Sequence, residues 1–166
     1  MSAAERKIAQ HHEEQKMMVI RKSIVIHASP EVVFNAITDP NELTNWFPDN
    51  AIFDGRIGGK VRFTFKKERS KDLDRDYCPE GSVKEFVPNK KVSYSWRLVD
   101  IPEFPETIVT WELEEIDPNK TKLEVIHSGF SGKEQGKLSF KEHDQGWSYF
   151  LSRLEEYLRK GKSSEK

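Results

Sequence analysis

One stretch, from His143 to Lys160, restricts the fold of this 166-residue chain more than any other. Its large apolar residues recur every three or four positions. They are Trp147, Phe150, Leu151, Leu154 and Leu158. This spacing predicts one long amphipathic helix with a single apolar face. Because a succession of strand-like segments precedes it, we expect that face to pack against a sheet.

The segments before this helix alternate apolar and polar residues, a period typical of half-buried strands. The first such run extends from Ile20 to His27. Two short helices are predicted next, because Ser29-Pro30 and Asp39-Pro40 are typical helix starts. The later runs are separated by turn signals such as Gly58-Gly59. The order predicts an α+β fold, in which a curved antiparallel sheet of about six to seven strands closes on the C-terminal helix.

The length of the chain suits one domain with tails. We expect residues 1–17 to form a polar N-terminal extension, because this segment has almost no apolar face. Residues 18–160 would form the single domain, and residues 161–166 a disordered tail.

Composition excludes several classes of protein. The formal net charge is −1, with both signs interspersed, which argues against nucleic-acid binding. No apolar run approaches the roughly 20 residues of a membrane span. The polar N-terminus does not look like a signal peptide. The single cysteine, Cys78, cannot form an internal disulfide and suits a reducing compartment, so we expect a cytoplasmic protein.

Large aromatic residues are predicted to face the helix from the sheet and the short helices. They are Trp46, Phe63, Tyr94, Trp96, Trp111 and Trp147. One interpretation is an ordinary packed core, the usual role of aromatics at alternating strand positions. The other is the wall of a ligand-sized cavity, because six flat rings fill irregular space poorly.

Three polar residues are candidates for contact with a ligand. Glu85 faces inward if the alternation from Val83 to Val87 is regular, whereas a register shift would turn Phe86 inward instead. His127 and His143 are candidates for acid–base chemistry, with a backbone hydrogen bond at the helix start as the other interpretation of His143. These residues lack the ligand spacing of a metal site. We therefore assign no metal, no cofactor and no catalytic residue.

Four stretches of the chain resemble a known family when taken together. They are residues 24–34 with 38–40 and 46–47, residues 58–63, residues 81–88 with 92–96, and residues 127–130 with 143–147. In order and spacing they resemble the Bet v 1-like, START-related (SRPBCC) superfamily. The most similar branch is the one named for the activator of Hsp90 ATPase. The polar N-terminal extension and the charged segment 67–79 depart from the family pattern.

The resemblance implies a helix-grip fold with a cavity between the sheet and the long helix. It also implies a carrier or sensor that binds a small hydrophobic molecule. Two alternatives remain open, a module that binds an Hsp90-type chaperone and a polyketide cyclase-like enzyme. We expect a binding protein rather than an enzyme, and fold alone does not decide among the three.

Overall fold

The computed structural model describes residues 18–67, 75–99, 101, 104–133 and 139–164, with side chains up to residue 161 in the last helix. The predicted N-terminal extension, most of the charged segment 67–79 and the last two residues of the predicted tail lie outside the described residues. The proposed domain limits therefore remain predictions.

Strands and helices follow one another in the predicted order. They are β1 (Ile20–Ile26), α2 (Pro30–Thr38), α3 (Pro40–Leu43), β2 (Asn50–Phe53), β3 (Lys60–Thr64), β4 (Pro79–Val87), β5 (Lys91–Leu98), β6 (Thr107–Asp117), β7 (Lys120–Ser128) and α4 (Phe140–Ser164).

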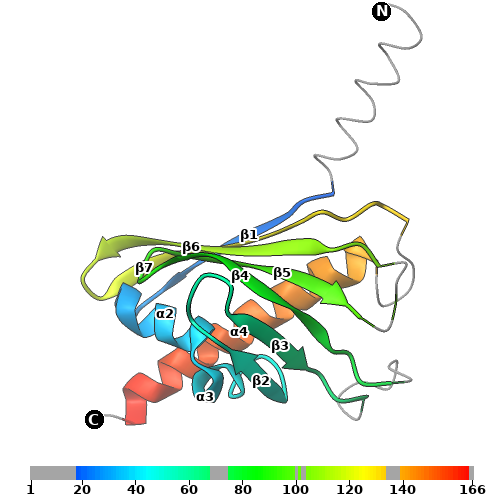
Figure 1. Cartoon of the computed structure of the whole chain (residues 1–166). Coiled ribbons are helices and arrows are strands. Elements are labelled where there is room, and N and C mark those ends of the chain that lie inside the picture. Colours follow the sequence, from blue (N-terminus) through cyan, green and yellow to red (C-terminus); the bar gives the residue numbers. More distant parts are fainter. Residues whose placement is uncertain (1–17, 68–74, 100, 102–103, 134–138, 165–166) are drawn as a thin grey trace, which may run out of the picture.

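The strands form a seven-stranded sheet in the order β1-β7-β6-β5-β4-β3-β2, with antiparallel pairing throughout. Figure 1 shows this sheet as one curved layer, with α4 running obliquely across its concave side and α2 and α3 on that same side. The predicted α+β helix-grip architecture is confirmed. Within the described residues, no helix is both long enough and apolar enough to cross a bilayer.

Side-chain caps set the starts of the helices. The Ser29 hydroxyl accepts the backbone N–H of Val32 at the start of α2, and the Asp39 carboxylate accepts that of Asn41 at the start of α3. At α4, the Ser139 hydroxyl accepts the backbone N–H of Glu142 at 3.2 Å. This cap starts α4 at Phe140, three residues before the predicted start. The helix also continues past Lys160, its predicted end, to Ser164.

A β-bulge in β4 decides which side of the sheet Glu85 occupies. Val83 pairs with Tyr94 and Glu85 with Ser93, so Lys84 is an extra residue without a counterpart on β5. An extra residue reverses the alternation of the strand that follows it. The partly buried Phe86 now faces inward against Phe34, at 5.3 Å between ring centroids. The prediction of an inward Glu85 is wrong, and the alternative with Phe86 inward is confirmed.

Candidate functional site

The space between the sheet and α4 is filled with contacting aromatic rings. Phe47, from the turn after α3, lies at their centre. Its ring contacts six others at centroid distances of 4.9–6.3 Å, namely Trp46, Phe63, Phe65, Trp96, Trp147 and Phe150. The sequence analysis did not select Phe47 for the site.

All six aromatics predicted to face the helix are buried in this interior. They also touch one another, because Trp111 contacts Trp46 at 6.3 Å and Trp147 at 5.5 Å between centroids. Trp96 and Phe63 continue the cluster at 5.9 Å. Core packing thus describes much of their role, and the cavity that they were expected to line remains a prediction.

The four tryptophans place their indole N–H groups on acceptors inside the protein. Trp46 donates to the carbonyl of Ala36 at 2.8 Å. The other three donate to side chains at 3.0 Å each, Trp96 to the Tyr77 hydroxyl, Trp111 to the Tyr94 hydroxyl and Trp147 to Nδ1 of His127. Since buried polar groups are costly unless paired, these bonds fix the orientation of each ring.

His127, at the end of β7, is fully buried between Trp147 and Thr107. Its Nδ1 accepts from Trp147, so this nitrogen carries no proton. The Thr107 hydroxyl donates to the carbonyl of Trp96 and lies 2.7 Å from Nε2 of His127. Nε2 must therefore be the protonated nitrogen that donates to Thr107. The hydrogen-bond partners assign His127 as a neutral imidazole.

Burial holds the pKa of His127 well below its usual value, and the nearby His143 adds to the effect. The two imidazole rings are 5.5 Å apart. A proton added to Nδ1 would also face the indole N–H of Trp147, donor against donor. His127 is therefore suited to accept a hydrogen bond in the core and poorly suited to carry charge.

His143 lies in the first turn of α4 and joins two further groups. A carbonyl can only accept, so Nδ1 of His143 donates to the backbone oxygen of Ser139 at 2.9 Å. Its Nε2 then accepts the hydroxyl proton of Tyr77 at 2.7 Å. The interpretation that His143 makes a backbone hydrogen bond at the helix start is confirmed.

Tyr77 is a polar member of the site that the sequence analysis missed. It is the sole aromatic residue of the charged segment 67–79, which the sequence analysis noted only as a departure from the family pattern. Two backbone hydrogen bonds of 2.8 Å with Phe65 hold it beside the sheet. Burial raises the pKa of Tyr77 well above its usual range, so its hydroxyl stays protonated. A single tyrosine within an otherwise charged segment was the sequence signal that could have identified Tyr77 as a buried residue.

Tyr77 and His143 mark the half-buried end of the aromatic interior. Phe104 and Phe130, from the segments after β5 and β7, approach His143 at 5.7 and 5.1 Å between ring centroids. Polar groups inside this interior are uncharged. Among the described residues, the buried polar side chains on the inner side of the sheet are those of Thr107, Thr121 and His127, whereas the buried Ser93 and Ser95 lie on the side of Glu85. The interior thus resembles an apolar solvent with a few neutral hydrogen-bonding groups.

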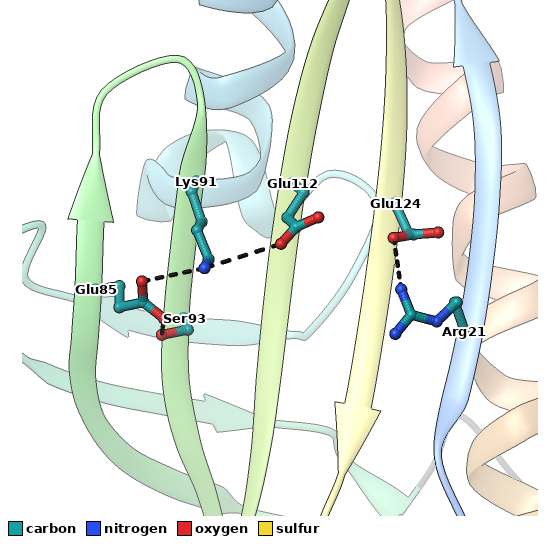
Figure 2. Close-up of polar contacts among 6 residues, drawn as sticks. All are labelled: Arg21, Glu85, Lys91, Ser93, Glu112 and Glu124. Atoms are coloured by element: carbon teal, nitrogen blue, oxygen red, sulfur yellow. Dashed lines mark hydrogen bonds and ion pairs between the residues drawn. The ribbon is translucent and has the colours of Figure 1, made fainter. Parts of the chain in front are cut away.

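Glu85 belongs to the opposite face of the sheet, as Figure 2 shows. Its carboxylate lies 3.1 Å from the Lys91 ammonium and its side chain is 52% exposed. Lys91 also approaches Glu112 at 3.8 Å, and Arg21 pairs with Glu124 at 3.0 Å. Of the nine residues predicted to contact a ligand, Glu85 is the one that the structure separates from the others.

Two hollows open beside α4, with volumes of about 460 and 370 Å³. The first lies between β1 and α4, next to Lys22 and Leu151, and the second lies near Tyr149 and Arg153. None of the nine predicted site residues lines either hollow. No group of three metal-ligating side chains comes together within the described residues.

A curved antiparallel sheet that grips a long C-terminal helix around an aromatic interior defines the Bet v 1-like, START-related class of proteins. Within that class, residues 27–159 match the family described as "Activator of Hsp90 ATPase homolog 1-like protein". The chain belongs to this family. None of the curated proteins compared with the chain matches it.

Solved structures similar to this one agree with the assignment. The Aha1 dimer from Colwellia psychrerythraea is 26% identical, with a TM-score of 0.66 over 82% of this chain and 92% of that one. An HSP90 activator from Plasmodium falciparum is also 26% identical, with a TM-score of 0.66 over 85% and 96%. A Chromobacterium violaceum protein shares the fold at 24% identity, with a TM-score of 0.71 over 84% and 95%.

Proposed function

We propose that the protein binds a small, uncharged hydrophobic molecule in the aromatic interior between the sheet and α4. One observation carries the proposal. An otherwise apolar cluster of rings contains a chain of neutral hydrogen-bonding groups that reaches the half-buried Tyr77 and His143. Buried polar groups are expensive, so their placement in such an interior favours recognition of a ligand over packing alone. We place this function in the cytoplasm, which suits the single cysteine.

Because the rings already touch, we expect a ligand to enter by separating them at the half-buried end. The carrier would gain affinity from burial of apolar surface, and the neutral polar groups would set the orientation of the ligand. A charged ligand would pay the full cost of desolvation, since the described interior offers no opposite charge.

The test is a titration with a library of uncharged hydrophobic compounds, followed by the indole N–H signals of the four tryptophans in nuclear magnetic resonance spectra. A ligand in the interior shifts the signals of Trp96, Trp111 and Trp147. It also raises the melting temperature, by an amount that corresponds to about 2.7 kcal/mol at a hundredfold excess over Kd. Binding in either surface hollow would leave the indole signals in place, because neither hollow is lined by tryptophan. That result, or no binding at all, would contradict the proposal.

A second candidate is docking onto an Hsp90-type chaperone, favoured by two similar structures described as Aha1 and as an HSP90 activator. The exposed face of the sheet, with Lys91 and Glu112, would supply the contact surface. Isothermal titration with Hsp90 tests this candidate. A charge reversal, Lys91→Glu, should weaken binding without shifting the indole signals, and unchanged binding would argue against this face as the docking surface.

A further inference from the structure

Tyr94 on β5 carries a fully buried hydroxyl group in the aromatic interior. Its residue is 0% exposed, and its ring lies edge-on to Phe53 and Phe63 at centroid distances of 5.6 and 5.8 Å. Its oxygen accepts the indole N–H of Trp111 at 3.0 Å. In that bond the oxygen is the acceptor, so the hydroxyl proton of Tyr94 needs a separate acceptor.

The hydrogen-bond donors of the other polar groups in the interior already have acceptors. Tyr77 donates to His143, Thr107 to the carbonyl of Trp96, and His127 to Thr107. The remaining indoles donate to the acceptors described above. Among the residues that the structure describes, the Tyr94 hydroxyl proton has no acceptor.

A buried donor without an acceptor loses the hydrogen bond that it made to water in the unfolded chain. Burial also raises the pKa of Tyr94 well above its usual range, so the group does not escape this cost by ionising. The Tyr94 hydroxyl therefore persists as a neutral donor surrounded by rings, and a partner that brings an acceptor satisfies it.

We propose that the Tyr94 hydroxyl donates a hydrogen bond to an acceptor atom, such as a carbonyl oxygen, on an uncharged cyclic molecule held in the aromatic interior. This inference rests on the proposed function and adds the specificity of the site. The ligand combines a flat apolar skeleton with at least one acceptor. Carboxylates and ammonium groups are disfavoured because the described interior holds no compensating charge.

The test uses two probes with one skeleton, 1-tetralone, which has a carbonyl group, and tetralin, which lacks it. Their dissociation constants are measured by calorimetry with the wild-type protein, Tyr94→Phe and the control Tyr149→Phe, whose ring is 54% exposed. We expect Tyr94→Phe to weaken 1-tetralone binding by about tenfold and to leave tetralin nearly unchanged, because only the ketone loses a hydrogen bond. Tyr149→Phe should change neither constant.

Equal effects of Tyr94→Phe on the two probes would overturn this inference while leaving the proposed function intact. Failure of both probes to bind the wild-type protein would overturn both. Should Tyr94→Phe fail to fold, the infrared carbonyl stretch of 1-tetralone bound to the wild-type protein decides. A shift to lower frequency than in hydrocarbon solvent supports the donor, and an unshifted band overturns the inference.

Discussion

On β5, Tyr94 and Trp96 point toward α4 and are buried, whereas Lys91 points to the opposite side and forms ion pairs in partial contact with solvent. The same strands thus carry two different surfaces. The inner face holds rings and neutral groups whose hydrogen bonds end inside the protein. The outer face holds charged side chains that form ion pairs in contact with solvent (Figure 2). Burial on the inner face is therefore the main source of stability, and the proposed ligand would be recognised there, whereas the charges of the outer face contribute little to stability.

The largest expected effect comes from removing the element that covers the inner face. A stop codon at Phe140 would expose the sheet side of the rings and delete Trp147, Leu151 and Leu154, each worth roughly 1.5–3 kcal/mol when buried. Since whole domains are stable by about 5–15 kcal/mol, we expect no folded state. A cooperative thermal transition in the shortened protein would show that the sheet is stable without α4.

A single ring at the centre of the inner face should matter almost as much. Phe47→Ala should lower the free energy of unfolding by about 3–5 kcal/mol, because the ring contacts six others and leaves a cavity. Urea denaturation measures this change. The matched control, Tyr149→Ala on the exposed side of α4, should change stability by roughly 0.5 kcal/mol or less. Similar losses for both variants would erase the distinction between the faces.

The pH dependence of stability tests the buried imidazole. Because the pKa of His127 is depressed in the folded protein, its contribution is fully present above the unfolded pKa of about 6.5 and is lost as the pH falls below that value. The slope should reach at most about 1.4 kcal/mol per pH unit. His127→Gln keeps a donor and an acceptor but cannot ionise, so it should flatten the curve between pH 6.5 and 5.

The control for this experiment is His27→Gln, at the exposed end of the first strand. It removes an exposed histidine by the same substitution, so it separates the effect of losing the buried imidazole from that of the substitution itself. If His127→Gln kept the full slope, another group would be the titrating one.

The smallest effect is expected on the outer face. Lys91→Met removes two ion pairs and should cost less than about 1 kcal/mol, since exposed pairs contribute little. The cost should shrink further in 1 M salt because screening weakens surface charges. A loss above 2 kcal/mol in thermal or urea denaturation would mean that the outer face also determines stability.

Much of this comparison could be predicted from the sequence, because side-chain alternation assigns faces wherever a strand is regular. The inward orientation of Tyr94, Trp96 and Trp111 followed directly from their spacing. Glu85 fell on the wrong face because alternation cannot reveal the extra residue at Lys84. The sequence analysis allowed for this shift, but the pattern of residues alone could not decide whether Glu85 or Phe86 faces inward.

Other features depend on contacts between distant segments. Phe47 lies at the centre of the rings only because the turn after α3 packs against α4 and β5. No local sequence pattern predicts that long-range contact. Tyr77 joins His143 across 66 residues of chain. The early start of α4 was recoverable, because Ser139 and Glu142 have the spacing of a capping box.

The contacts of the tryptophans have an optical consequence. Trp46, Trp111, Trp147 and Trp96 touch in that order, and the chain contains four tryptophans. Excitation absorbed by one indole can be transferred to its neighbours before it is emitted, so the emission of the four tryptophans is coupled. A quencher that reaches any one of these rings should therefore lower the fluorescence of all four tryptophans.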